Sequence, residues 1–148
     1  MAIDISSKIN SAWWALRVAL GLGAFLAGLD KFFNILTNWS MYLSPFAEHL
    51  LPVSGHAFML AVGVVEMLVG LAVLTRWTRL AAYVAAVWLA SIALNLVATG
   101  MFFDLAVRDI EMAVAAYALA RLSEARAILQ PADTLRGVDD PVSADRAA

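Results

Sequence analysis

The 148-residue sequence contains no cysteine. A disulfide framework, a thiolate metal site and CxxC redox chemistry are therefore excluded. Charge is also scarce, because Asp, Glu, Lys and Arg make up 15% of the chain, whereas an average soluble domain has about 25%. The net charge is −2 and the signs are scattered. Without a basic patch, nucleic acid is not an expected partner.

Hydrophobic residues take the place of the missing charge and make up 63% of the chain. The mean hydropathy is +0.80. A compact domain of this size buries only about two-thirds of the surface of its unfolded chain, so a single core cannot hide this much apolar surface. The excess must face something other than water. The composition predicts an integral membrane protein whose main partner is the lipid bilayer.

Four stretches approach the roughly 20 apolar residues that a helix needs to cross a hydrocarbon core of about 30 Å. They are residues 13–33, 57–74, 80–98 and 105–122. The last three are joined by short connections, which are typical of antiparallel neighbouring helices. The pattern predicts an all-α fold, a transmembrane four-helix bundle over residues 1–126. A flexible cytoplasmic tail is predicted over residues 127–148, because Pro, Gly and alternating charges recur there.

The first connection, residues 34–56, differs from the others because it is long and rich in aromatic and apolar side chains. Pro45 and Pro52 interrupt it, and we predict an interfacial segment that lies on the membrane. Lys31 and Arg108 lie near span ends on the same side as this segment, whereas more basic residues lie on the other side: Lys8, Arg76, Arg79, Arg121 and Arg126. The positive-inside rule therefore predicts that both termini lie in the cytoplasm.

The first predicted span carries a stripe of five residues at alternating spacings of four and three, which lie on one helix face. They are Arg17, Gly21, Ala24, Gly28 and Lys31. Small residues let membrane helices approach closely, so the three in the middle are predicted to pack against another helix. Gly63 and Gly70 of the second span are assigned the same role. Arg17 is expected to point inward, whereas Lys31 is expected either to point inward or to snorkel to the interface.

Glu66 lies in the middle of the second predicted span. An ionised carboxylate at that depth costs several kcal/mol unless it is paired, hydrated or protonated. Arg17 and Arg108 are the expected partners, and the spacing of the sequence leaves both pairings open. Glu66 is expected either to hold the bundle through an ion pair or to handle a proton or orient a ligand.

Arg108, Asp109 and Glu111 open the fourth predicted span. Asp109 is expected to act as an N-cap or first-turn acid, and Glu111 to pair with Arg108. Together with Lys31 and Asn95 they predict a polar cavity that opens outward, either as a ligand site or as a buried polar network. His49 and His56 match no metal-ligand spacing, so no metal site is predicted. No cofactor motif is recognised, so no intrinsic cofactor and no catalytic residue are predicted.

Short motifs run through the predicted spans: Arg17-x3-Gly21-x3-Phe25-x2-Gly28-x2-Lys31, Glu66-x3-Gly70, Arg76 and Arg108-Asp109. In these motifs, over about residues 15–122, the chain resembles the DoxX-like family of small four-helix bacterial membrane proteins. The resemblance implies a location in the bacterial cytoplasmic (inner) membrane. It also implies an association with membrane oxidoreductase systems, such as a thiosulfate:quinone oxidoreductase.

The first functional hypothesis is therefore an accessory subunit of a membrane oxidoreductase system that binds a quinone or similar lipophilic ligand between its helices. Arg17, Glu66 or Arg108 would contact the quinone carbonyls. The alternative is a structural or assembly subunit without chemistry of its own, and the second alternative is a small-solute carrier. Enzyme activity of the chain alone is not expected. A protein partner in the membrane is expected, and a homo-oligomer is compatible with the sequence.

Overall fold

The computed structural model describes residues 5–138, which form helices joined by turns and loops, with no strand among them. The elements are α1 (Ile5–Asp30), the 3-10 helix η1 (Trp39–Tyr42), α2 (Pro45–Leu50), α3 (Gly55–Leu74), α4 (Thr78–Ala98) and α5 (Phe103–Val138). By length and composition, α1, α3 and α4 can cross a membrane. The predicted all-α fold is therefore confirmed, and the three apolar helices are consistent with a membrane protein.

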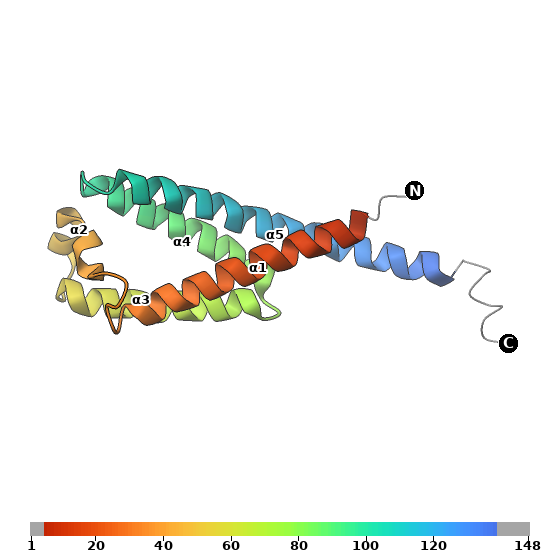
Figure 1. The fold of residues 1–148 in the computed structure, drawn as a ribbon, viewed down its shortest axis with the longest axis horizontal. Coiled ribbons are helices and arrows are strands. Elements are labelled where there is room, and N and C mark those ends of the chain that lie inside the picture. The colour runs from red at the N-terminus through yellow and green to blue at the C-terminus, as the bar shows by residue number, and fades with distance from the viewer. Residues whose placement is uncertain (1–4, 139–148) are drawn as a thin grey trace.

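The four long helices lie side by side, with η1 and α2 grouped at one end (Figure 1). α1 packs against α3, and α4 packs against α5. Further contacts join α1 to α5 and α3 to α4, so the two pairs form one assembly. The first turns of α1 and the last turns of α5 lie at the end opposite α2, and α5 projects beyond the other helices there (Figure 1).

The contact between α1 and α3 depends on glycine. A β-carbon built on Gly28 would lie 2.5 Å from the carbonyl oxygen of Gly63, and one built on Gly63 would lie 2.6 Å from that of Gly28. The same relation recurs farther along, where a β-carbon on Gly70 would lie 2.6 Å from the carbonyl oxygen of Gly21. Ala24, on the same stripe, is half-buried. The two backbones touch because no side chain separates them.

The contact between α4 and α5 uses alanine in the same way. Its buried core consists mainly of small residues: Ala81, Ala82, Ala85, Ala116, Leu119 and Ala120. Large apolar side chains lie on the outside of all four long helices, for example Leu22, Leu68, Val87 and Val114. An apolar exterior around a core of small residues suits helices that are surrounded by lipid.

The largest differences from the predicted boundaries are at the start of α1, which begins at Ile5 instead of residue 13, and at the end of α5. The helix α5 continues through residues 127–138, which were predicted to belong to the tail. The good helix formers Ala, Leu, Arg and Glu run on past residue 122 without a break before Pro131, which explains the continuation. Residues 139–148 of the predicted tail lie outside the described residues. The predicted interfacial segment, residues 34–56, contains η1 and α2.

The short helices are defined by local capping. Asn38 precedes η1, and its side chain accepts a hydrogen bond from the backbone N–H of Ser40 at 3.2 Å. Ser44 precedes α2 and accepts one from Ala47 at 3.2 Å. Pro45, which was predicted to interrupt the chain, instead occupies the first turn of α2, where a proline has no N–H to leave unpaired.

Candidate functional site

A buried ion pair joins the end of α1 to the middle of α3. Lys31 Nζ lies 2.5 Å from Glu66 Oε2, and the two side chains are only 4% and 11% exposed. Gly28 makes the pair possible, because a β-carbon built on it would lie 2.9 Å from the Glu66 Cβ and crowd that side chain. The expected pairing of Glu66 with Arg17 or Arg108 is therefore wrong, and Lys31 points inward.

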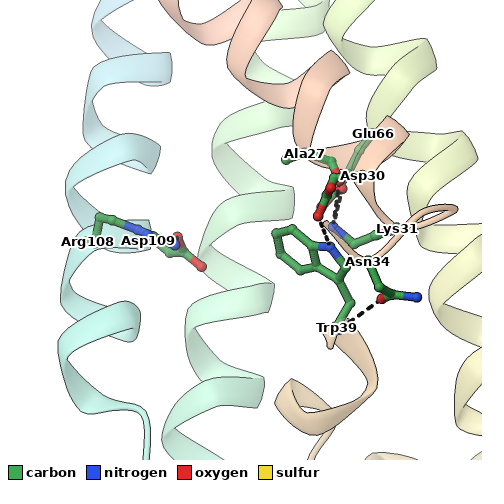
Figure 2. A network of polar contacts seen from close by, with 8 residues as sticks. All are labelled: Ala27, Asp30, Lys31, Asn34, Trp39, Glu66, Arg108 and Asp109. Atoms are coloured by element: carbon green, nitrogen blue, oxygen red, sulfur yellow. Dashed lines mark hydrogen bonds and ion pairs between the residues drawn. The ribbon is translucent and has the colours of Figure 1, made fainter. Parts of the chain in front are cut away.

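An aromatic ring covers the lysine. Lys31 Nζ lies 3.8 Å from the ring centroid of Trp39 in a cation–π contact. The Trp39 indole Nε1 donates to Asp30 Oδ2 at 2.8 Å, and Asp30 also accepts from the backbone N–H groups of Ile35 and Leu36. Figure 2 shows Asp30, Trp39 and the ion pair in one cluster. Asp30 thus shapes the chain after α1 and holds Trp39 over Lys31.

Sequence reasoning missed Trp39, although the adjacent Asp30 and Lys31 at a span end were a signal that a polar cluster begins there. Asn34 also contributes to the position of Trp39, and it adopts a left-handed backbone conformation with φ 52° just after α1. Its side-chain oxygen accepts from the backbone N–H of Trp39 at 3.4 Å. Asn tolerates this conformation better than most residues because its short polar side chain bonds locally.

The helices α4 and α5 bring two further polar groups toward the ion pair. Trp88 Nε1 of α4 is buried without a hydrogen-bond partner in the described part of the chain. It lies close to the Glu66 carboxylate, but the contact lacks the geometry of a hydrogen bond. Asp109 of α5 is also buried and interacts electrostatically with Lys31 and Glu66.

The cluster holds more buried carboxylates than buried cations. Lys31 faces the carboxylates of both Glu66 and Asp109. Arg108 lies 3.7 Å from Asp109, but its side chain is 60% exposed, so water or lipid headgroups screen it. Figure 2 shows Arg108 and Asp109 on α5, across from the ion pair. The cluster therefore offers acceptors on two helices, the Lys31 ammonium group and one unused N–H donor, that of Trp88.

The roles expected for Asp109 and Glu111 are not the ones found. Because α5 begins at Phe103, Asp104 is the acid of its first turn and Asp109 comes too late to cap it. Arg108 forms its salt bridge with Asp109 instead of Glu111, and Glu111 is exposed. The helix starts two residues earlier than predicted, which places both acids farther from its end.

Arg17 lies at the C-terminal end of α3, away from Glu66. Its guanidinium donates to the backbone carbonyls of Val73 at 3.1 Å, Leu74 at 2.5 Å and Thr75 at 2.7 Å. These carbonyls end α3, where unpaired acceptors and the negative end of the helix dipole favour a cation. The structure therefore places Arg17 as a C-terminal cap of α3 and not in the ligand cluster.

Asn95 holds the short helices against α4. Its Nδ2 donates to the carbonyl oxygen of Tyr42 at 2.7 Å, and its Oδ1 accepts from the backbone N–H of Ser44 at 3.1 Å. The amide thus joins α4 to the junction of η1 and α2, and Ser44 is itself buried. Asn95 supports the end of the molecule where the cluster lies, without a contact to the ion pair.

Lys31, Glu66, Trp88 and Asp109 converge from four separate parts of the chain, so only the folded helices assemble the site. Among the described residues, no group of three or more His, Cys, Asp or Glu side chains is arranged to hold a metal ion. The arrangement instead suits the polar end of an uncharged molecule that can accept a hydrogen bond. No family model, curated protein or solved structure matches the chain.

Proposed function

We propose that the chain is a four-span protein of the bacterial inner membrane, with both termini in the cytoplasm, that binds a quinone or similar lipophilic ligand beside the Lys31–Glu66 pair. In this proposal it serves a membrane oxidoreductase system as an accessory subunit. The membership of the DoxX-like family suggested by the sequence motifs is part of the same proposal.

The proposal takes α5 as a fourth span, in addition to the three apolar helices. Its support is the close packing of α5 along α4, where Ala116, Leu119 and Ala120 have no exposed surface. Between Glu111 and Arg121, α5 contains no charged residue, and Asp109 in its earlier part is buried. If α4 spans the membrane, a helix that packs along it over this length lies at the same depth in the bilayer.

The observation that carries the ligand proposal is the unpartnered indole N–H of Trp88. A buried donor without an acceptor costs about 1–3 kcal/mol. Glu66 lies near this N–H, but the contact lacks the geometry of a hydrogen bond. A quinone carbonyl would accept from Trp88 Nε1 while its ring lies among apolar side chains, so binding would recover the lost hydrogen bond.

The test compares two tryptophan variants. Trp88→Phe keeps the aromatic bulk but removes the N–H, and Trp14→Phe makes the same change at an exposed position of α1. Each protein, purified in mild detergent, is titrated with ubiquinone-1, and binding is measured by equilibrium dialysis. The Trp88 variant is expected to bind about threefold to tenfold more weakly, the value of one hydrogen bond. Equal affinities in all three proteins would exclude this ligand position.

A second candidate function is a structural subunit of a larger membrane complex. The direct pairing of Lys31 with Glu66 and the capping role of Arg17 favour it. These charged groups stabilise the fold through contacts within the chain and need no ligand. Isolation from native membranes in mild detergent distinguishes the two. A stoichiometric protein partner with no quinone in the lipid extract supports the structural subunit, whereas retained quinone supports the ligand-binding one.

A further inference from the structure

A second cluster lies at the end of the molecule opposite α2, where α1 begins. Trp13 of α1 is buried, and its indole Nε1 donates to Ser123 Oγ of α5 at 2.7 Å. Ser123 in turn donates to the carbonyl oxygen of Leu119 at 2.8 Å. The Trp13 ring is therefore fixed between two helices and offers a rigid support for other groups.

Two arginines from different helices gather at this ring. The guanidinium carbon of Arg17 lies 4.7 Å from the Trp13 ring centroid, and that of Arg126 lies 3.9 Å from it. Arg17 also lies 4.8 Å from the ring of Trp14. The two cations are close enough to repel each other. The aromatic rings offset part of this repulsion but supply no full negative charge.

No carboxylate in the described part of the chain forms a salt bridge with either arginine. The acid nearest to Arg126 in sequence is Glu124, and it is already engaged. It accepts from Arg121 at 2.6 Å and from the Tyr83 hydroxyl at 2.9 Å. Two cations held together without an anion among the described residues make a site that a bound anion can occupy.

The surroundings of the site identify the kind of anion. Arg17 caps α3 at the end of a helix that can cross a membrane. Exposed tryptophans, Trp14 and Trp77, lie at this end, and the Arg76 guanidinium carbon is 5.7 Å from the Trp77 ring centroid. Exposed tryptophan and arginine at the ends of apolar helices are typical of the membrane interface, where the lipid phosphates lie.

We propose that Arg17 and Arg126, held at the ring of Trp13, bind the phosphate of an anionic phospholipid headgroup. The bound phosphate neutralises the repulsion between the two guanidinium groups and ties α1 to α5. The site depends on the membrane location of the apolar helices but not on a ligand at Lys31 and Glu66, because Glu66 lies in the middle of α3 and not at its C-terminal end.

The test is native mass spectrometry of the full chain with phosphatidylglycerol and, as the neutral reference, phosphatidylcholine. Arg126→Gln removes a cation that has no ion pair among the described residues, and Arg121→Gln, as control, removes a paired one on the same helix. The Arg126 variant is expected to bind the first phosphatidylglycerol about fivefold more weakly, since one basic residue near an anionic lipid contributes about that factor. The control is expected to bind it as the wild type does.

Three results would overturn the proposal. These are an unchanged affinity of the Arg126 variant, an equal loss in the Arg121 variant, and displacement of the lipid by inorganic phosphate at a matching concentration. A second measurement leaves Arg17 and Arg126 in place, so it does not depend on how the Arg126 variant folds. A photo-crosslinking residue at exposed Ala127 is expected to capture phosphatidylglycerol, and one at Asn38, at the other end, is not. Equal capture at both positions would also contradict the site.

Discussion

Gly28 of α1 and Gly63 of α3 approach so closely that a β-carbon on either would overlap the carbonyl oxygen of the other. Lys31 and Glu66 each follow one of these glycines by one helical turn. The contact of the two backbones thus brings an ammonium group and a carboxylate together inside apolar surroundings. The buried ion pair is a consequence of the glycine contact, because a wider helix spacing would separate the charges.

Alanine at Gly28 or Gly63 is expected to destabilise the protein by about 1–3 kcal/mol, the usual cost of forcing a group into a packed contact. Gly23→Ala is the matched control, because nothing lies within 4 Å of its added β-carbon. Alanine there is expected to be neutral or to stabilise by up to about 1 kcal/mol through helix propensity. Denaturant unfolding in detergent measures all three. A Gly28 variant as stable as the wild type would contradict the described contact.

The ion pair is expected to behave as a coupled unit. Lys31→Met or Glu66→Met alone leaves a buried charge without its partner, which costs about 3–5 kcal/mol. The double variant removes both charges, so its loss is expected to be clearly smaller than the sum of the two single losses. Unfolding free energies of the four proteins give this coupling. Strict additivity would mean that the two groups do not interact in the membrane protein.

Asn95→Leu is expected to loosen η1 and α2 while the long helices stay folded. The substitution removes both hydrogen bonds that join α4 to Tyr42 and Ser44. The groups left unsatisfied cost about 1–3 kcal/mol, so local opening of η1 and α2 is expected to become about fivefold or more frequent. Hydrogen exchange over residues 39–50 measures it. Ser91→Ala, one turn earlier on α4 and bonded only within its own helix, is the control.

The absence of native cysteine makes the topology directly testable, because each introduced cysteine is unique. Asn38→Cys and Met101→Cys are expected to react with a membrane-impermeant maleimide in intact cells. Thr75→Cys and Ala127→Cys are expected to react only after the membrane is permeabilised. If α5 does not cross the membrane, positions 101 and 127 will react alike. Reversed labelling of all four sites would show that the orientation is inverted.

The sequence was sufficient to predict the helical fold, because long apolar stretches and short connections leave few alternatives. It also pointed to the glycines of α1 and α3, which do lie where these helices meet. The partner of Glu66 could not be derived in this way. Depth estimates along separate helices gave Arg17 or Arg108, whereas the pairing depends on which helices are neighbours and on the backbone turn after Asp30.

Arg17 illustrates the same limit. Its position inside an apolar stretch predicted an inward-pointing group, but sequence spacing carries no information on the three carbonyls that end α3. Trp88 was not singled out either, because a tryptophan in an apolar helix has no distinguishing pattern. Its importance comes from what surrounds its N–H in the folded chain.

The pairing of helices, α1 with α3 and α4 with α5, divides the polar cluster between two bodies. Lys31 and Glu66 belong to the first body, and Trp88 and Asp109 belong to the second. A small sliding of one body over the other would change the distance from Trp88 to Glu66 and leave the salt bridge intact. The ligand proposed beside Trp88 would therefore lie where the two helix pairs meet.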